Sequence, residues 1–339
     1  MQPMSLHTDH IQRQKDVLII RSHILKTIRE FFWQDGFLEV ETPLILRFPG
    51  QEPYLSPVEL IIHDDRKNEH QAFLHTSPEY TMKKMLAAGF DNIFFLGKTF
   101  RDYESFGGTH NPEFTMLEWY RVSASMFDIM KDVESLFQEL QQTLEKLEIG
   151  NWKFLTFEKV SMKDLWQQTI DVNLDNHLTQ ETMFSLCKRR GYNVADEESY
   201  EDLFYRIFLN EIEPTFCNQK SKIIIYNYPA PMAALARLSD TDPGYAERFE
   251  VYIDGMEIAN AFSELTDGKE QLKRLQEEQA LRKKLGKTIY DIDMDFIEAV
   301  GKLPTCAGIA LGVDRLVQVL TGCKNIDDVL SLPMSNMFE

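Results

Sequence analysis

Hydrophobic positions recur with a helical period in several long stretches of the chain. Between about Ile11 and Gln34, apolar side chains fall every three or four residues and Asp35-Gly36 supplies a stop signal, which predicts a helix. The same period predicts four later helices, at Met126 to about Glu148, Met162–Thr169, Glu181–Arg190 and Tyr200–Ile212. No linker composition borders residues 123–220, so we interpret them as a helical insertion. We expect a single domain over residues 17–339, after a polar extension over residues 1–16.

Extended patterns lie before and after this insertion. A strand is predicted at Phe37–Glu41, where Pro43 ends it. The pair Asp254-Gly255 is a strong hairpin signal between two strands of the segment from Arg248 to Leu265. Further strands are predicted at Asn92–Leu96, at Ile223–Pro229 and from Gly308 up to a helix near Asp314.

The segment Phe100–Arg121 resembles a β-hairpin with unusual polar side chains. Alternation on its second strand separates one face (Phe114, Met116, Glu118, Tyr120) from the other (Glu113, Thr115, Leu117, Trp119). Arg101 enters the hairpin, and an aromatic ring and a carboxylate leave it on a shared face. This suits a planar base and an anionic phosphate. A solvated hairpin with aromatic core residues and charged edges explains the strand alone equally well.

A two-residue turn at Asp254-Gly255 would place Tyr252 opposite Glu257, with Glu250 on the same face. Two carboxylates would then converge. Since like charges repel, such a pair favours a bound cation, and hard oxygen ligands suit Mg²⁺. The alternative is a strand whose carboxylates face solvent.

Two further charged residues lie at predicted helix starts. Ser77 is suited to cap a helix with Pro78 in its first position, which places Glu79 in the first turn, where the helix dipole favours an anion. Capping alone explains Glu79 about as well as a binding role does. Arg315 opposes the dipole of its helix, so we expect either an anionic ligand or a salt bridge.

Composition narrows the class of protein. The 339 residues are 43% hydrophobic and carry a net charge of -18, which disfavours binding to nucleic acid through phosphate neutralisation. The four cysteines are widely separated, as in a reducing compartment. We find neither a signal peptide nor an apolar run of about 20 residues and expect a cytoplasmic protein without a membrane span. The charged residues Gly268–Gly286 predict a surface helix with no further role.

Three motifs in order, GFLEVETP, FR…HNPEF and GVDR, resemble the signatures of class II aminoacyl-tRNA synthetases. HNPEFTMLEWY, RFEVYIDGMEIANAFSEL and LGVDRLV are most similar to the lysyl branch, and the resemblance covers about Val17 to Leu320. It implies an α+β fold, with an antiparallel sheet flanked by helices. It also implies a homodimer formed through the first motif.

The first motif begins within forty residues, which leaves no room for the anticodon-binding domain of a lysyl-tRNA synthetase. The chain therefore resembles the elongation factor P–(R)-β-lysine ligase family. Ala310 fits this, because lysyl-tRNA synthetases resemble one another in having glycine there. The resemblance implies that the enzyme activates a lysine-type amino acid with ATP and transfers it to a lysine of elongation factor P, with tRNA an improbable partner.

The resemblance implies ATP and Mg²⁺ as cofactors. Catalytic roles fall to Arg101 at the α-phosphate, Arg315 at the γ-phosphate and Glu257, which with Glu250 would hold Mg²⁺, while Phe114 would stack on adenine. The full nucleotide set comprises Arg101, Asp102, Glu104, His110, Asn111, Phe114, Glu257, Ile258, Gly312 and Arg315. The second motif departs from its usual Arg-x-Glu, so either Glu104 or Asp102 takes the place of the glutamate.

A diamino acid needs carboxylates at its amines, and the resemblance offers Glu79 and Glu264. The implied amino-acid set is Ser77, Glu79, Tyr120, Asn260, Phe262, Glu264 and Ala310. Simple alternation does not place Glu264 on the face of Glu257, so we expect either a bulge or a separate wall. No general base for amide formation is evident.

Two other functions remain open. A truncated lysyl-tRNA synthetase would share the activation step and act on tRNA. A non-catalytic nucleotide-binding paralogue is expected to lack Arg101, Glu257 or Arg315, and all three are present.

Overall fold

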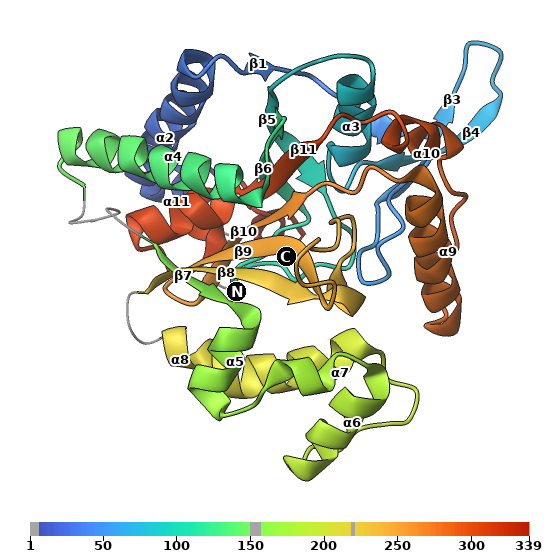
Figure 1. The fold of residues 1–339 in the computed structure, drawn as a ribbon. Coiled ribbons are helices and arrows are strands. Elements are labelled where there is room, and N and C mark those ends of the chain that lie inside the picture. The colour runs from blue at the N-terminus through green and yellow to red at the C-terminus, as the bar shows by residue number, and fades with distance from the viewer. Residues whose placement is uncertain (1–6, 150–156, 218–220, 339) are drawn as a thin grey trace, which may run out of the picture.

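The computed structural model describes residues 7–149, 157–217 and 221–338 (Figure 1). Within these residues, an eight-stranded sheet forms the centre of the fold, and its neighbouring strands are antiparallel except for the parallel pairs at its two edges. This confirms the predicted antiparallel sheet flanked by helices. Across the sheet, the strands are β1 (Leu38–Glu39), β5 (Ile93–Phe100), β6 (Glu113–Val122), β11 (Cys306–Gly312), β10 (Met256–Ser263), β9 (Tyr245–Ile253), β8 (Lys222–Pro229) and β7 (Glu158–Ser161).

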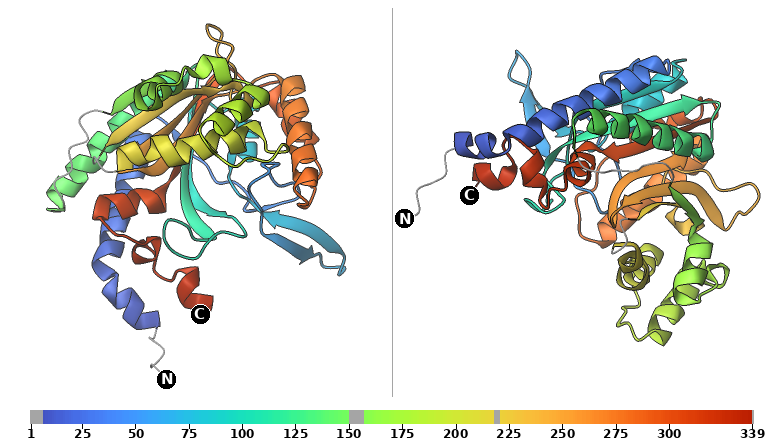
Figure 2. Two further views of the ribbon diagram at one scale, coloured as in Figure 1. Left: turned by 90° about the horizontal axis from the view of Figure 1, so that it is seen from below. Right: turned by 90° about the vertical axis from the view of Figure 1, so that its left-hand side faces the viewer.

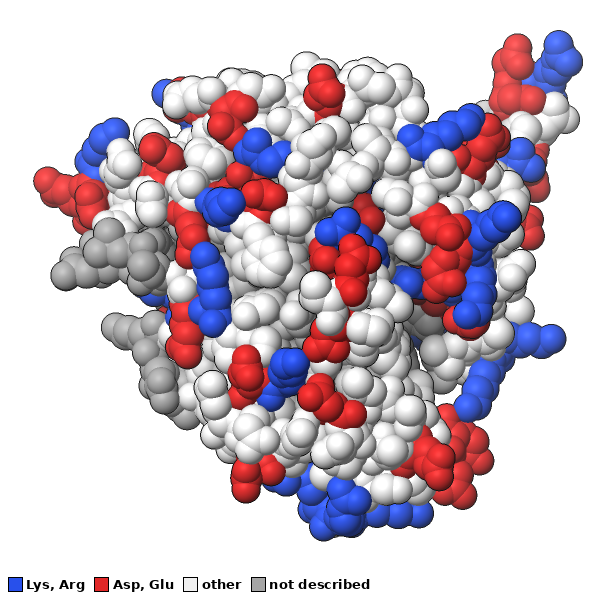
Figure 3. Space-filling model, in the orientation of Figure 1, with Lys and Arg blue, Asp and Glu red and all other residues white. Residues whose placement is uncertain are grey.

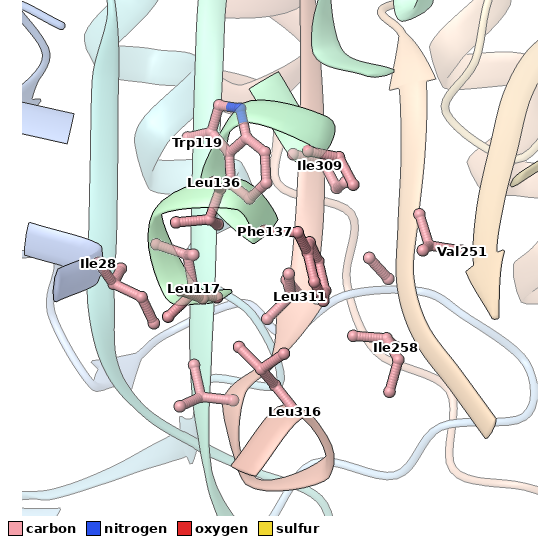
Figure 4. Packing of buried hydrophobic residues seen from close by; sticks show 14 of the residues in the cluster. Ile28, Leu117, Trp119, Leu136, Phe137, Val251, Ile258, Ile309, Leu311 and Leu316 are labelled. Atoms are coloured by element: carbon pink, nitrogen blue, oxygen red, sulfur yellow. The ribbon is translucent and has the colours of Figure 1, made fainter. Parts of the chain in front are cut away.

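One face of the sheet is closed by helices α2 (Lys15–Gln34), α4 (Met126–Lys146) and α11 (Val313–Thr321). Figure 4 shows Leu117 and Trp119 of β6 among side chains from these helices and the neighbouring strands. Both are fully buried, as the alternation in the sequence predicts for this face. Glu118, which lies between them, therefore points to the opposite face of β6.

The opposite face is only partly covered, by helices α3 (Glu79–Ala87), α9 (Gly268–Lys284) and α10 (Met294–Val300) at one side of the molecule. Tyr80 of α3 stacks on Phe296 of α10, with ring centroids 3.8 Å apart. A small sheet of β2 (Ile45–Leu46), β4 (Glu69–Leu74) and β3 (Glu59–His63) projects beyond these helices. The middle of this face, over β6, β11 and β10, is left open.

Of the helical insertion predicted at about residues 123–220, α4 packs into the main core, and the part after residue 157 forms a separate helical group. This group contains α5 (Met162–Ile170), η1 (Leu174–His177), α6 (Gln180–Arg189), α7 (Tyr200–Ile207), the π-helical turn η2 (Phe208–Ile212) and α8 (Glu213–Cys217), which pack into a core of their own against β7 and β8. Two details differ from the prediction. The stretch predicted as one helix over Tyr200–Ile212 changes to a π-helical turn at Phe208, and the unpredicted β7 joins the main sheet.

The two ends of the described chain lie together (Figure 2). Helix α1 (His7–Arg13) precedes α2, and its His10 ring lies 3.3 Å from the carbonyl oxygen of Leu330. That carbonyl follows η4 (Ile326–Val329) and precedes α12 (Met334–Phe338). The described chain is thus helical from its first residue, His7, which lies within the stretch predicted as a polar extension; the first six residues of that stretch lie outside the described residues.

Two strand predictions need correction. The strand predicted at Phe37–Glu41 is reduced to the two residues of β1. The first strand of the predicted Phe100–Arg121 hairpin begins at Ile93, so the segment predicted as a separate strand at Asn92–Leu96 is its start. Arg101 therefore follows the end of β5 directly. Among the described helices, none combines the length and apolar character needed to cross a membrane.

Candidate active site

Two adjoining cavities lie over the open face of the sheet. The smaller has a volume of about 180 Å³ and the larger about 520 Å³. They share wall residues from three strands and from the loop before β3, including Glu52, Arg101, Met116, Asn260 and Ala310. The two cavities therefore form one continuous space, with Arg101 at the junction.

Because of a β-bulge, β10 contributes side chains to the walls of both cavities. Glu257 pairs with Tyr252 as predicted, but the register then shifts and Ala259 pairs with Val251. Ile258 is the extra residue. Beyond it, the strand keeps Asn260, Phe262 and Glu264 on the side of Glu257, so the structure selects the bulge over the separate wall.

The smaller cavity is lined by all seven residues predicted to bind the amino acid, Ser77, Glu79, Tyr120, Asn260, Phe262, Glu264 and Ala310. Glu118, which alternation placed on this face, joins them. Its carboxylate accepts hydrogen bonds from the Ser77 hydroxyl at 2.6 Å and the Tyr120 hydroxyl at 3.3 Å. Burial and the nearby Glu79 raise the pKa of Glu118 to about 8.

Ser77 has two partners. Helix α3 begins at Glu79 with Pro78 at its cap, one residue later than predicted, and the Glu79 amide still donates to the Ser77 hydroxyl oxygen at 3.0 Å. The Ser77 proton is left for Glu118. One serine thus fixes both the helix start and a pocket carboxylate.

A buried lysine neutralises part of this acidic pocket. Lys83 Nζ lies 2.7 Å from Glu79 Oε1 and 2.6 Å from Glu264 Oε2. Burial would lower the pKa of Lys83, but these two carboxylates hold it above its ordinary value. Burial raises the pKa of Glu264 to about 7, against the opposing effect of Lys83. With Glu118, three carboxyl groups meet one cation, so the pocket suits a ligand that carries more than one ammonium group.

Three arginines, Arg101, Arg248 and Arg315, line the larger cavity. The Arg101 guanidinium lies over the Phe114 ring, 5.1 Å from its centroid. Its buried Nε has no hydrogen-bond partner among the described residues, and burial lowers the pKa of Arg101. A cation held in this way, with an unused donor, is suited to an anionic ligand.

Arg315 is fixed by the loop between β5 and β6. Its guanidinium donates to the carbonyl oxygens of Thr109 and Glu257 and to His110 Nε2 at 2.9 Å. Burial and the charge of Arg315 lower the pKa of His110, so at neutral pH its imidazole is uncharged and can accept this bond. Arg315 Nη1 also lies 3.5 Å from Glu257 Oε2, so the salt bridge expected as one alternative is present, and it is the longest of these contacts.

Eight of the remaining predicted nucleotide residues also line the larger cavity: Glu104, His110, Asn111, Phe114, Glu257, Ile258, Gly312 and Arg315. Asp102 does not. It is exposed on the loop, and its carboxylate accepts from the next backbone amide. Of the two alternatives for the second-motif glutamate, the structure thus places only Glu104 in the cavity.

The two predicted magnesium ligands differ in their surroundings. The Glu257 carboxylate borders the larger cavity, and burial followed by the charge of Glu250 raises its pKa. Glu250 lines neither cavity, because its carboxylate accepts hydrogen bonds from Arg248, Tyr228 and Tyr252 at 2.6–2.7 Å. No cluster of three or more His, Cys, Asp or Glu suited to a metal occurs in the described parts of the chain. Of the two, only the Glu257 carboxylate lies where it could hold an Mg²⁺ ion in the cavity, because the Glu250 carboxylate is engaged by its three hydrogen-bond donors.

Arg248 was not identified from the sequence. It donates to the Asn260 side-chain oxygen at 3.1 Å and to Glu250. Glu250 therefore helps, through Arg248, to orient a residue shared by both cavities. An arginine two residues before a glutamate on the same strand is the signal that could have indicated this pair.

The charged helix α9 is not the simple surface element that we expected. Arg282 is buried and donates to the carbonyl oxygens of Glu52 and Leu55, which lie in the cavity wall. Glu278 lines both cavities. The helical spacing of Gln271, Leu275, Glu278 and Arg282 marks one inward face within the charged stretch.

Comparison with known proteins identifies the family. Residues 4–336 match the family of class II tRNA synthetases (D, K and N). An elongation factor P–(R)-β-lysine ligase of Yersinia enterocolitica is 39% identical over 321 residues, 94% of this chain and 94% of the relative. Ligases of the same name from Avibacterium paragallinarum and Histophilus somni are 37% and 40% identical, over 94% and 93% of this chain and 95% and 94% of their own. The chain therefore belongs to the class II tRNA synthetase family and, within it, to the elongation factor P–(R)-β-lysine ligases.

Proposed function

We propose that the protein activates (R)-β-lysine with ATP and transfers it to the side-chain amine of a lysine in elongation factor P. The observation that carries this proposal is the continuous cavity, in which a carboxylate-rich pocket meets a larger chamber at Arg101. Such a space can hold a small diamino acid in contact with a nucleotide. The related ligases are named for this activity.

Activation requires the carboxylate of the amino acid to attack the α-phosphorus of ATP, which forms an acyl–O–P bond and releases pyrophosphate. Arg101 lies at the junction and can hold both reacting anions, while Phe114 offers its ring to the adenine. Arg315 would bind the γ-phosphate from the other part of the chamber. Mg²⁺, held by Glu257 and supported by Glu250, would neutralise charge on the phosphates.

The two ammonium groups of the amino acid would lie among Glu118, Glu264 and Glu79. There, hydrogen bonds to these carboxyl groups would replace the hydrogen bonds that the ammonium groups make to water. Asn260, which Arg248 orients, would bind the same substrate from β10. Ala310 stands between Glu118 and Asn260 in the sheet, so its methyl group limits where the amine nearer the carboxylate can lie.

In the transfer step, the nitrogen of the acceptor lysine forms a bond to the acyl carbon and the bond from that carbon to the phosphate oxygen breaks. The products are an amide and AMP, and the nitrogen loses two protons on the way from ammonium to amide. The same continuous cavity serves both steps, because the acyl group remains beside Arg101.

We propose a homodimer formed through α2 and β1. Ile19, Trp33 and Leu38 on these elements are large apolar side chains that are about half exposed, at 48%, 53% and 52%. We also propose a cytoplasmic enzyme that does not use tRNA. The net charge is -18, and basic and acidic side chains are interspersed over the face in Figure 3, where a tRNA backbone would require a continuous basic surface.

The test is mass spectrometry of elongation factor P after incubation with the protein, ATP and either (R)-β-lysine or α-lysine. We expect the acceptor to gain the mass of one lysyl residue, faster with (R)-β-lysine, and no gain with the Arg101→Ala variant. An unchanged acceptor, or aminoacylation of tRNA by the pure protein, would overturn the proposal.

A further inference from the structure

Two neighbouring glutamates of α9 have opposite surroundings. Glu277 faces solvent, where its carboxylate lies 3.8 Å from Lys273 and both side chains are 66% exposed. Glu278 instead lines the wall of both cavities. Because successive residues of a helix point about 100° apart, only one of the two reaches the active site.

The position of Glu278 is fixed by the residues on either side of it. Four residues earlier, Arg274 donates to the carbonyl oxygens of Ala234 and Ala236 at 2.9 Å and 2.8 Å. Four residues later, Arg282 donates to the loop that carries Glu52. These bonds tie α9 to both sides of the cavity, so Glu278 is held at the junction where Arg101 also lies.

The structure shows no interaction by which the Glu278 carboxylate would stabilise the described part of the fold. Among the described residues it makes neither a hydrogen bond nor an ion pair. Glu118 and Glu264 differ in this respect, since Glu118 accepts from two hydroxyl groups and Glu264 pairs with Lys83. Glu52 also lines both cavities without an ion pair to a described residue, but it lies on a loop, whereas Glu278 is held on a helix that is tied at both sides. An acidic group at a cavity junction without a partner is available to a ligand.

We propose that Glu278 accepts the proton that the acceptor lysine must lose before its nitrogen attacks the acyl group. This inference rests on the proposed function. The acceptor ammonium transfers one proton to the Glu278 carboxylate, and the free electron pair of the nitrogen then forms the bond to the acyl carbon as AMP departs. The second proton leaves from the nitrogen after bond formation and passes to water.

The electrostatics of the junction support this role. Burial raises the pKa of Glu278 to about 8, and the negative charges of Glu52, Glu201 and Glu79 act in the same direction against Arg274. A glutamate with an ordinary pKa of about 4.3 is a weak base toward a lysine ammonium of about 10.4, and the raised value narrows this gap. About a tenth of a carboxyl group with a pKa of about 8 is ionised at pH of about 7, and this ionised fraction is the base.

Glu278 and these three glutamates together form a group of carboxyl groups whose negative charge attracts a cation to the junction. Glu52 comes from the loop before β3, Glu79 from α3, Glu201 from α7 and Glu278 from α9. Glu201 lines the larger cavity and also an open pocket of about 620 Å³ beside α7. Through Tyr54 and Glu201, which line both, this open pocket adjoins the larger cavity that Glu278 also lines.

The experiment compares Glu278→Gln with Glu277→Gln in two separate half-reactions. Exchange of pyrophosphate into ATP, driven by (R)-β-lysine, reports activation, and single-turnover transfer from the isolated enzyme–adenylate complex to elongation factor P reports amide formation. For Glu278→Gln we expect exchange within about twofold of wild type and transfer slower by about 100-fold. Glu277→Gln should match wild type in both.

The pH dependence of transfer separates a proton acceptor from a structural role. The rate for Glu278→Gln should rise about tenfold per pH unit up to pH of about 9.5, because hydroxide replaces the carboxylate, whereas the wild-type rate should level off near pH of about 8. Glu278→Asp should restore part of the rate and provides a second variant if the glutamine variant does not fold.

Two outcomes would overturn the inference. Transfer by Glu278→Gln at the wild-type rate would show that the carboxylate is not the proton acceptor. A rise of more than about tenfold in the KM for (R)-β-lysine during exchange would instead assign Glu278 to an amine of the amino acid. If wild-type protein fails to modify elongation factor P at all, the proposed function fails, and this is distinguishable from either outcome.

Discussion

Lys83 and Glu264 form an ion pair 2.6 Å long at the floor of the smaller cavity, with side chains that are 0% and 1% exposed. They come from α3 and from the end of β10, so the pair joins a helix to the central sheet. Removal of either partner of a buried ion pair leaves an uncompensated charge, which strongly destabilises the folded state.

Replacement of Lys83 should therefore be costly. Lys83→Met leaves Glu264 and Glu79 without their cation, and we expect the free energy of unfolding at pH of about 8 to fall by about 3 kcal/mol. Urea denaturation measures this. Lys84→Met is the matched control, because Lys84 is 36% exposed beside Asp293, and it should cost less than about 1 kcal/mol. Equal losses in the two variants would contradict the prediction.

Glu118 should make stability depend on pH. Its pKa is about 8 in the folded protein and near 4.3 in the unfolded chain, so the folded state binds its proton more tightly. The contribution to stability is fully present below pH of about 4.3 and is lost as the pH rises through about 8. Glu118→Gln removes this loss, so its stability relative to wild type should improve between pH of about 5 and 8.5, by about 4 kcal/mol.

Denaturation of both proteins at the two pH values gives the comparison for Glu118. The same measurement on Glu113→Gln serves as the reference, because Glu113 lies on the same strand with a side chain that is 41% exposed. A constant offset between wild type and Glu118→Gln at both pH values would argue against the buried carboxyl.

Arg315 should be intolerant even of lysine. Its guanidinium reaches Thr109, His110 and Glu257 at once, and a single ammonium group cannot reproduce this geometry. We expect Arg315→Lys to slow pyrophosphate exchange by about 100-fold, chiefly through a higher KM for ATP, with little change in the KM for the amino acid. Wild-type kinetics in ATP would remove Arg315 from the proposed phosphate site.

Gly308 should admit no side chain. A Cβ atom there would lie 2.3 Å from Cε1 of Tyr120 and 2.8 Å from Oε1 of Glu264. The Gly308→Ala variant must displace a buried ring and a pocket carboxylate, so we expect at least a tenfold rise in the KM for (R)-β-lysine while the KM for ATP stays near wild type. An unchanged amino-acid KM would mean that Tyr120 and Glu264 do not bind this substrate.

Ala310 should influence the choice between lysine isomers. Ala310→Gly removes the methyl group between Glu118 and Asn260, and a group of this size changes discrimination by about tenfold or more. We expect the ratio of kcat/KM for α-lysine to that for (R)-β-lysine to increase by this factor in pyrophosphate exchange. The wild-type ratio is the control. An equal ratio in the variant would mean that other residues determine which lysine isomer is preferred.

Much of the site was predictable because alternation and motif spacing are local properties. The sequence placed Glu118 and Tyr120 on one face of a strand and Glu257 opposite Tyr252, and the structure confirms both. It left open how Glu264 joins Glu257, because a bulge changes register through a single residue and carries no obvious sequence signal.

Long-range contacts were beyond sequence reasoning. Lys83 was assigned no role, although its partner Glu79 is four residues away, because its second partner is Glu264 on another element. Glu278 was missed since a helix rich in charges is usually solvated on every face. Only the packing of α9 against the cavity distinguishes its one inward glutamate.

The bulge at Ile258 has a consequence for how this enzyme can change. Glu257, at the phosphate end of the active site, precedes the bulge in β10, whereas Asn260 and Glu264, at the amine end, follow it. The bulge therefore determines that side chains at both ends point to the same face of the sheet. Removal of Ile258 would rotate one set of side chains toward the core and leave the other in place. New amino-acid specificity can therefore arise by exchange of side chains along β10, whereas insertion or deletion in this strand would separate amino-acid binding from catalysis.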